Sequence, residues 1–349
     1  MSTSLAYRED FDPVMSIEEE DAIEIPVSKI RADVRKAART LTPMEARYVV
    51  DSYYQMQENR KRSANQRRSL VKAGEPNLAV SYLATESERI EGEVKYMLKS
   101  FADARPVGEW AQSIVGIGPI IAAGLIAHID IAKCQTVGPI WRYAGLDPTI
   151  QWLGKDKVRK IVSERLTKAK PTEDDFRAIA QEVRGISFDA AYRIATVKKD
   201  GSIMPLTRDR IIKSLSLRPW NASLRTLCWK IGESFVKVSN KEGDIYGHMY
   251  ARQKAFYIEQ NEQGAYEQYA ILRAAQVGSG TDAYGYYSKG LLPPGHIYSR
   301  AKRWTTKMFL SHWHHVAYHV HYGTKPPRPF VIEHMGHSKE ISPPNWPLA

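Results

Sequence analysis

The chain has 349 residues and a formal net charge of +11, with 50 lysines and arginines against 39 aspartates and glutamates. Its length exceeds that of one ordinary domain, so we expect two or three packed units. Two cysteines, Cys134 and Cys228, exclude a disulfide framework and lack metal-ligand spacing, so we expect small core residues in a reducing compartment. The longest apolar run, residues 115–129, is too short for a membrane helix, which predicts a cytoplasmic protein without a membrane partner.

The charge is unevenly distributed. Residues 1–28 carry eight acidic and one basic side chain, which leaves a net charge of +18 on the remainder. We predict that residues 1–41 form an acidic, disordered head, either a solvated tail, which we favour, or a cover for the basic surface. The positive charge of the remainder predicts a polyanionic partner.

Two long helices are predicted to follow as an antiparallel hairpin over residues 42–105. Thr42-Pro43-Met44-Glu45 supplies an N-cap, a proline at the first helical position and a glutamate three residues on, and Gly74-Glu75-Pro76 ends this helix near Lys72. Its second half is basic, which is typical of a solvated face but also suits phosphate contact: Arg60, Lys61, Arg62, Arg67, Arg68 and Lys72. The second helix, 76–102, carries an apolar seam that could also be a partner surface: Leu83, Ile90, Val94, Met97 and Phe101.

The most informative segment is 115–123, within a predicted hairpin motif at 109–129, where two glycines interrupt an apolar run. Val115-Gly116-Ile117-Gly118-Pro119 predicts a tight turn between two short helices, because glycine tolerates positive φ and proline starts a helix without losing an N–H bond. The amides from Gly116 to Ile120 would be free to bind an anion at the positive end of the second helix. Five apolar residues would hold the two helices together: Ile114, Ile117, Ile121, Leu125 and Ile126. This pattern is that of a helix-hairpin-helix, which contacts backbone phosphates without reading base sequence; the alternative is a buried hairpin that contacts only protein.

We assign residues 106–240 to a domain that contains this motif. The string Tyr143-Ala144-Gly145-Leu146-Asp147-Pro148 precedes a predicted basic loop with four cations: Lys155, Lys157, Arg159 and Lys160. An inserted helical subdomain is expected at about 160–205, where a helix over 171–185 has a T-x-x-D cap and an apolar face: Phe176, Ile179, Ala180 and Val183. A further helix is predicted to begin at Pro219, with core residues at Leu224, Leu227, Ile231 and Phe235.

The C-terminal helices are assigned to residues 241–323, followed by a proline-rich tail at 324–349. Helical stretches near 246–262 and 264–276 precede a glycine- and tyrosine-rich loop, 278–298. The last helix, 299–322, is predicted to end at Gly323 and to direct five side chains to a core: Trp304, Phe309, Trp313, Val316 and Val320. No β-alternation or internal repeat is present, so we predict a mainly α fold, in which a long helical hairpin precedes a helix-hairpin-helix-containing helical domain.

Three segments in this order resemble the C-terminal half of the Piv/MooV group of insertion-sequence transposases (insertion-sequence-110 type). These are the glycine turn, the string Tyr143–Pro148, and Ser216-Leu217-Arg218-Pro219-Trp220-Asn221-Ala222-Ser223-Leu224-Arg225. In that family a G-I-G-P-x-x-A turn leads into a Y-A-G-L-x-P string and then a basic, Asn- and Arg-containing helix start. The resemblance covers about residues 78–238, apart from the inserted segment, and the coupling of the first two motifs is characteristic.

The resemblance implies a nuclease-like N-terminal domain with four acidic metal ligands, and a nucleophilic serine in an S-G pair after the Y-A-G-L-x-P string. Here the aligned pair is Leu153-Gly154, so leucine occupies the serine position. The region before residue 78 reads as helical instead of the strand-rich start that such a domain needs. The hairpin at 42–102 is similar to the helical linker that joins the two halves in the family. The chain therefore resembles the DNA-binding half of these transposases without their catalytic residues.

Catalytic groups elsewhere are weakly indicated. Three acids near the turn and the basic loop have ordinary density and no metal motif: Asp130, Asp147 and Asp156. Three serines lie near basic residues, where capping or phosphate-binding roles are usual: Ser163, Ser214 and Ser216. Histidines cluster near the end of the chain and could bind zinc, but their aromatic neighbours favour packing or base stacking: His312, His314, His315, His319, His321, His334 and His337.

We therefore predict a DNA-binding protein of the transposase or recombinase type, from a mobile element, that grips the duplex backbone as a homo-oligomer. The expected nucleic-acid-binding residues are Gly116, Ile117, Gly118, Lys155, Lys157, Arg159, Lys160, Arg218 and Arg225. No catalytic residue, metal ligand or cofactor is assigned, and Mg²⁺ is expected only if the chain is catalytically active. The alternatives are a catalytically silent accessory or regulatory factor that binds DNA or structured RNA, and an active transposase with a relocated nucleophile.

Overall fold

A computed structural model describes residues 32–166, 170–183, 185–327 and 341–346. Within these ranges the chain forms fifteen α-helices, one short 3₁₀-helix and no β-strand, so the predicted mainly α fold is confirmed. The N-terminal helices are α1 (Ala32–Arg39), α2 (Pro43–Lys72), α3 (Leu78–Asp103), α4 (Pro106–Gln112) and α5 (Pro119–His128). The middle elements are η1 (Ile131–Lys133), α6 (Val137–Tyr143), α7 (Gly154–Arg165), α8 (Glu173–Val183), α9 (Phe188–Thr196) and α10 (Arg208–Leu215). The C-terminal helices are α11 (Ala222–Lys237), α12 (Tyr246–Glu262), α13 (Glu267–Ala274), α14 (Asp282–Tyr287) and α15 (Pro294–Tyr322).

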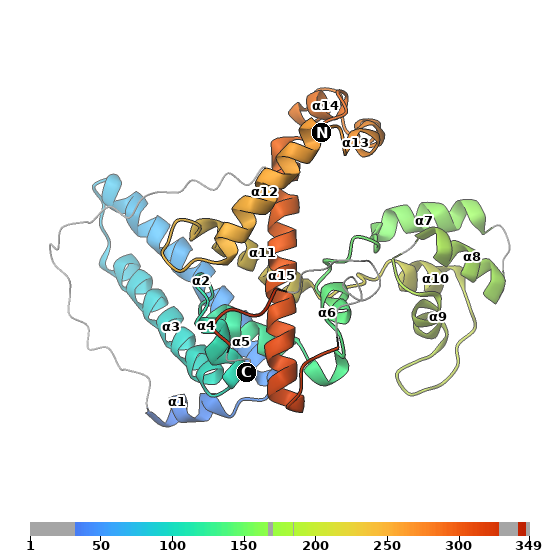
Figure 1. The fold of residues 1–349 in the computed structure, drawn as a ribbon. Helices are drawn as coiled ribbons and strands as arrows, with labels where there is room; N and C mark the ends of the chain where they lie inside the picture. Colours follow the sequence, from blue (N-terminus) through green and yellow to red (C-terminus); the bar gives the residue numbers. More distant parts are fainter. Residues whose placement is uncertain (1–31, 167–169, 184, 328–340, 347–349) are drawn as a thin grey trace.

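Helices α2 and α3 lie side by side along most of their length (Figure 1). The Thr42 side chain accepts from the Glu45 amide and the Glu45 carboxylate accepts from the Thr42 amide, which forms the predicted capping box at the start of α2. Farther along, Arg60 of α2 pairs with Glu91 of α3. A local capping box thus defines the start of the hairpin, and an ion pair joins its two helices farther along.

The apolar seam predicted on α3 is confirmed near the end of the helix, where Phe101 is fully buried and Val94 packs against a core, but it is displaced by one position at Leu83 and Ile90. Leu83 and Ile90 are 58% and 39% exposed, whereas Ala84 and Glu91 are buried against α2. The seven-residue spacing is retained, but the inward position holds a carboxylate, because it meets the Arg60 guanidinium of the partner helix. The apolar pattern therefore selected Ile90, one residue before the position that faces α2.

The boundary of the predicted acidic head also requires correction. Residues 1–31 lie outside the described residues, but 32–39 form α1, which packs against α3. The guanidinium of Arg35 lies 5.3 Å from the centre of the Tyr96 ring of α3. Residues 32–39 thus belong to the helical body and not to a disordered head.

The main core lies where α4, α5, α11, α12 and α15 meet. Phe309 of α15 lies at its centre and is fully buried, with its ring 5.9 Å from Trp110, 5.4 Å from Phe235 and 5.3 Å from Tyr246. The five residues expected to hold the helical hairpin together all join this core, three fully buried and two partly: Ile114, Ile117, Leu125, Ile121 and Ile126. Cys134 and Cys228 are both buried there as free thiols.

Helices α7 to α10 have an apolar core of their own, and the unit they form lies to one side of the main body (Figure 1). The inserted subdomain expected at about 160–205 therefore extends over 154–215. Helix α8 buries the four predicted residues of its apolar face, and Thr172 and Asp175 cap it as expected. The predicted basic loop is wrong, since its four cations lie in α7. The left-handed Gly154, at φ +79°, turns the chain directly into that helix.

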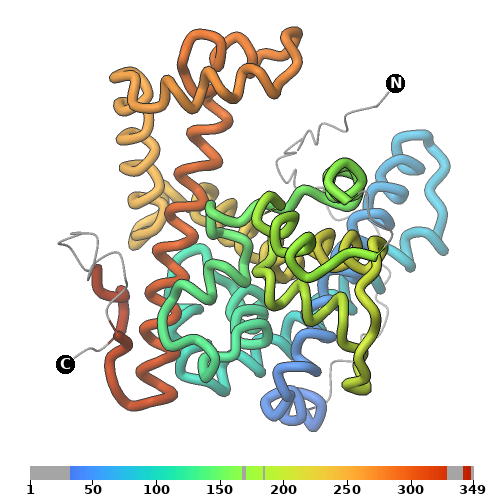
Figure 2. The backbone as a smooth tube through the Cα atoms, turned by 90° about the vertical axis from the view of Figure 1, so that its right-hand side faces the viewer, coloured from blue at the N-terminus to red at the C-terminus, as the bar shows by residue number. Residues whose placement is uncertain are grey.

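The C-terminal helices surround a third core, and α13 and α14 lie at the N-terminal end of α15 in both views (Figures 1 and 2). The loop predicted at 278–298 is wrong in part, because it contains α14 and the first turn of α15. Thr281 caps α14, and Pro294 starts α15 five residues earlier than expected. Helix α15 ends at the predicted Gly323, with φ +70°, but Val320 in its last turn is 41% exposed and does not reach a core. Likewise, α11 begins at Ala222 with Asn221 as N-cap, and not at Pro219.

A buried histidine gives the main core a defined pH dependence. The Nε2–H of His312 donates to the Ile341 carbonyl at 2.9 Å, which leaves Nδ1 to accept from the Tyr246 hydroxyl at 2.7 Å in a neutral ring. Burial lowers the pKa of His312 to about 4, against the opposing effect of the Ile341 hydrogen bond. Because the unfolded chain binds this proton near pH 6.5 and the folded chain does not, stability is retained above that pH and lost as the pH falls toward 4.

We expect His312 alone to lower the free energy of unfolding by up to about 3 kcal/mol between pH 7 and pH 4. Urea denaturation at several pH values measures this slope. The His312→Gln variant lacks this titrating group and should show a shallower slope, with a remainder from His128, His296 and His314, whose pKa values are also lowered by burial. Equal slopes for the two proteins would contradict the assignment.

Candidate nucleic-acid interface

The turn between α4 and α5 has the left-handed glycine that the sequence predicts. Gly116 has φ +94°, and Gly118 is the N-cap of α5 in extended conformation. No side chain caps α5, and Pro119 at its first position has no N–H. Both glycines are partly exposed, whereas the Ile117 side chain is only 5% exposed and belongs to the main core.

The two glycines have different surroundings. The Gly116 carbonyl accepts from the Ser234 hydroxyl, and a Cβ at Gly116 would lie 3.0 Å from Val238 Cγ2. A Cβ at Gly118 would meet nothing within 4 Å. The expectation that every amide of the turn is free is wrong at Ile117, whose N–H donates to the Ile114 carbonyl at 2.9 Å. The open part of the turn is therefore its second half, at the start of α5.

This difference predicts opposite tolerance to alanine. Gly116→Ala should lower the free energy of unfolding by about 1–2 kcal/mol, because an L residue is strained at this φ and its Cβ presses on Val238. Gly118→Ala should change it by less than about 0.5 kcal/mol, since its backbone is extended and its side open. Chemical denaturation of the two variants checks this, and a Gly118→Ala protein as unstable as Gly116→Ala would show that the turn is packed differently.

The four predicted cations of α7 lie in the small helical unit and not beside the turn. Helix α7 packs against α8 and α10, and all four side chains are exposed: Lys155, Lys157, Arg159 and Lys160. Arg159 lies 3.8 Å from Asp156, and Lys160 3.9 Å from Glu164, so two of them have acidic neighbours on the same helix. Such exposed pairs are weak and leave the cations accessible.

The structure brings together two of the strings on which the family resemblance depends. The backbone N–H of Asn221 donates to the Tyr143 carbonyl at 2.9 Å, and the Asn221 side chain donates to the Tyr143 hydroxyl at 3.0 Å. Gly145 has φ +67°, and a Cβ there would lie 2.8 Å from Trp220 and 3.0 Å from Arg225 Nη1. Gly145 is thus needed for the close approach of Trp220 and Arg225, because a side chain at this position would overlap both.

Trp152, Arg218, Trp220 and Arg225 form what we call the tryptophan–arginine cluster. The Arg218 guanidinium lies 4.8 Å from the centre of the Trp152 ring, and that of Arg225 lies 4.2 Å from the Trp220 ring. The two indole rings meet edge to face at 6.2 Å, and Trp152 Nε1 donates to the Ser216 carbonyl at 3.0 Å. Two predicted binding residues, Arg218 and Arg225, are therefore neighbours of one another and of two aromatic rings.

A third arginine extends the positive charge of this cluster. Burial and the charges of Arg303, on α15, and Arg218 lower the pKa of Arg225. All three guanidinium groups belong to exposed residues, and none has an acidic partner within 4 Å in the described part of the chain. Like charges held together without a counter-ion are a feature of sites that bind anions.

This arrangement suits contact with a nucleic acid. A guanidinium stacked on an indole is held in place at little further entropic cost, while its edge N–H groups stay free for a bidentate bond to phosphate. Trp152 is 42% exposed, so its ring can also stack on a base or sugar.

Sequence reasoning found the two arginines of the cluster but missed both tryptophans and Arg303. The adjacent Arg218-Pro219-Trp220 was a local signal for one ring, whereas Trp152 and Arg303 come from distant segments.

Most of the acids and serines considered as catalytic candidates have local structural partners. Asp130 caps η1 and pairs with Lys133, and Asp147 accepts from Thr149. The hydroxyls of Ser214 and Ser216 donate to carbonyls one turn earlier in α10: those of Ile211 and Ile212. Asp156 and Ser163 lie on the exposed surface of α7. Leu153, at the serine position of the family, is the N-cap of α7 and packs against the core of the small unit.

Three histidines in the second half of α15, His312, His314 and His319, act in packing. Besides His312, His314 Nε2 lies 2.8 Å from the Cys134 carbonyl, and the His319 ring lies 6.0 Å from Trp346. No group of three or more histidine, cysteine or carboxylate side chains within the described ranges has the arrangement of a metal site. His334 and His337 lie outside the described residues.

No protein-family model, curated protein or solved structure matches this chain. Among the described helices, none combines the length and apolar character required to cross a bilayer.

Proposed function

We propose that this chain binds DNA through its phosphate backbone, as a protein of the transposase or recombinase type. The observation that supports this most directly is the tryptophan–arginine cluster with Arg303, in which three accessible guanidinium groups have no acidic partner among the described residues. A basic remainder of the chain, with a net charge of +18 beyond residue 28, supplies the long-range attraction that such binding needs.

The resemblance to the Piv/MooV group supports DNA over other polyanions. Its second and third strings meet at Gly145, Trp220 and Arg225, so the segments that define the resemblance are also those that build the cluster. The glycine turn would add a second phosphate contact at the open start of α5, where Gly118 has free space around it.

The salt dependence of binding tests the proposal. Fluorescence anisotropy with duplex, branched and single-stranded DNA and with structured RNA, each at several salt concentrations, gives the slope of log K against log salt. Each phosphate contact should contribute about 0.9 to that slope for a duplex. Affinity that does not change with salt would overturn the proposal, and preference for RNA would replace DNA as the partner.

A catalytically silent accessory factor is the second candidate, and Leu153 at the serine position favours it. A nicking and strand-transfer assay with Mg²⁺ distinguishes the two. Product that is lost on substitution of one acid or serine assigns an enzyme, and trapping of a covalent protein–DNA adduct locates a relocated nucleophile. Tight binding without product or adduct assigns the accessory factor.

A further inference from the structure

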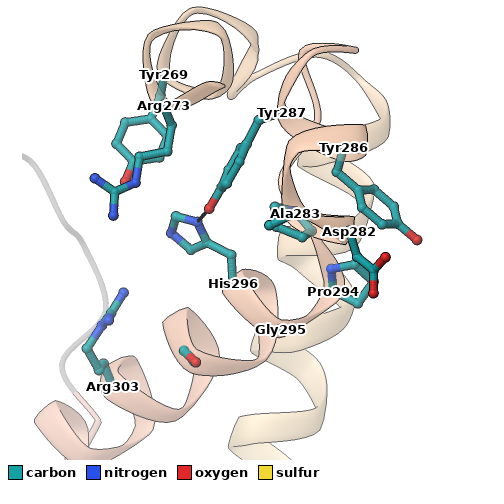
Figure 3. Close-up of a pocket in the computed structure, with 12 residues that line it drawn as sticks. Tyr269, Arg273, Asp282, Ala283, Tyr286, Tyr287, Pro294, Gly295, His296 and Arg303 are labelled. Atoms are coloured by element: carbon teal, nitrogen blue, oxygen red, sulfur yellow. Dashed lines mark hydrogen bonds between the residues drawn. The ribbon is translucent and has the colours of Figure 1, made fainter. Parts of the chain in front are cut away.

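A cavity of about 690 Å³ lies between α13, α14 and the start of α15, and apart from Arg303 its lining residues take no part in the binding described above (Figure 3). Its volume lies within the range of about 300–1,000 Å³ that is usual for pockets that hold a small molecule. Arg303, which adds its charge to the tryptophan–arginine cluster, also lines this cavity. The cavity is therefore next to the surface proposed to bind phosphates.

The cavity has two chemically different sides. The guanidinium groups of Arg273 and Arg303 lie on one side of the His296 ring (Figure 3). Arg273 donates to the neutral Gln276 side chain at 2.7 Å, and neither arginine has a carboxylate partner within 4 Å in the described chain. Asp282 lines the opposite side, where its carboxylate can accept from an N–H or O–H group.

Aromatic rings form the walls. His296 Nδ1 lies 2.9 Å from the Tyr287 hydroxyl, which fixes the orientation of the imidazole ring. The Tyr269 ring meets it edge to face at 5.6 Å, and Tyr269 and Tyr286 are 49% and 42% exposed. Burial and the charges of Arg303, Arg300 and Arg273 lower the pKa of His296, which keeps this ring neutral beside the arginines. A neutral aromatic wall suits a planar ring.

From these features we propose that the cavity takes one unpaired nucleotide of the bound nucleic acid, with its phosphate at Arg273 and Arg303 and its base beside Tyr269 and His296. An anionic end, a flat ring and hydrogen-bond donors toward Asp282 are found together in a nucleotide, whereas inorganic phosphate would leave the aromatic walls and Asp282 without a partner. This inference rests on the proposed function, because Arg303 connects the cavity to the cluster that would hold the strand.

The test uses the full chain and two DNA probes that share one duplex. One probe is blunt, and the other carries a single unpaired 2-aminopurine nucleotide with a 5′-phosphate. We expect the wild-type protein to bind the overhang probe at least tenfold more tightly than the blunt one, and stacking on the aromatic wall to quench its fluorescence. Arg273→Gln and Tyr269→Ala should each remove most of this preference and of the quenching, while affinity for the blunt duplex changes less than twofold.

The controls separate this inference from the proposed function. Lys289→Gln removes an exposed cation of the same unit that does not line the cavity, and should behave as wild type. If Arg273→Gln behaves like Lys289→Gln on the overhang probe, this inference fails while blunt-duplex binding stands. If neither probe binds the wild-type protein, the proposed function fails. Adenosine monophosphate that binds without DNA as tightly as the overhang would assign a free nucleotide instead, and equal binding of inorganic phosphate would exclude recognition of the base.

Discussion

Replacing Arg218 and Arg225 together by glutamine is expected to lower DNA affinity about 100-fold at low salt. Each guanidinium would lose a charge-assisted hydrogen bond to phosphate, which is worth about 1.5–3 kcal/mol, or roughly tenfold or more in affinity. The slope of log K against log salt should also decrease by about 2, because two phosphate contacts are removed. Anisotropy titrations of the variant at several salt concentrations measure both quantities.

The control for this experiment must remove the same charge elsewhere. Arg252→Gln with Lys289→Gln takes one exposed cation from α12 and one from the turn that follows α14, and should lower affinity only a few-fold through net charge. Because Arg225 stacks on Trp220, the thermal unfolding of both double variants must be compared with that of wild type. Equal losses of affinity in the two double variants would show that net charge, and not the cluster, attracts DNA.

Signals within a few residues of one another predicted the helix ends well. The Thr42 capping box, the Thr172 cap of α8 and the left-handed Gly323 each depend on hydrogen bonds or φ angles within one turn, which the sequence contains in full. The same local rules extended the loop at 278–298 too far, because the Thr281 cap of α14 follows a glycine-rich segment that masked it. The longer helices were thus predictable, with correct boundaries where a cap was recognised, whereas α1, α7 and α14 were predicted as head or loop.

Positions set by a distant partner could not be predicted in the same way. On α3 the inward residue is Glu91 and not Ile90, because Arg60 faces it from another helix. At the candidate site, Arg218 was found from its own string, but Trp152 and Arg303 join it only through the fold. The sequence contains each of these residues, but it does not show which distant residue each of them contacts in the folded chain.

The largest expected loss of stability comes from Phe309→Ala, at the centre of the main core. Its ring contacts Trp110 of α4, Phe235 of α11 and Tyr246 of α12, so its removal leaves a cavity shared by three helices. Fully buried phenylalanines replaced by alanine cost about 3–5 kcal/mol in free energy of unfolding. Chemical denaturation of the variant measures this loss directly.

Phe256→Ala on α12 is the matched control, since the same atoms are removed from a side chain that is 48% exposed. It should cost less than about 1 kcal/mol, because surface substitutions leave no cavity. The comparison also bears on function: Phe309 joins α4 of the glycine turn to α11, which carries Arg225, so both proposed phosphate contacts depend on this core for their relative position. A Phe309→Ala protein that unfolds like the Phe256→Ala control would mean that the turn and the cluster are not held by a common core.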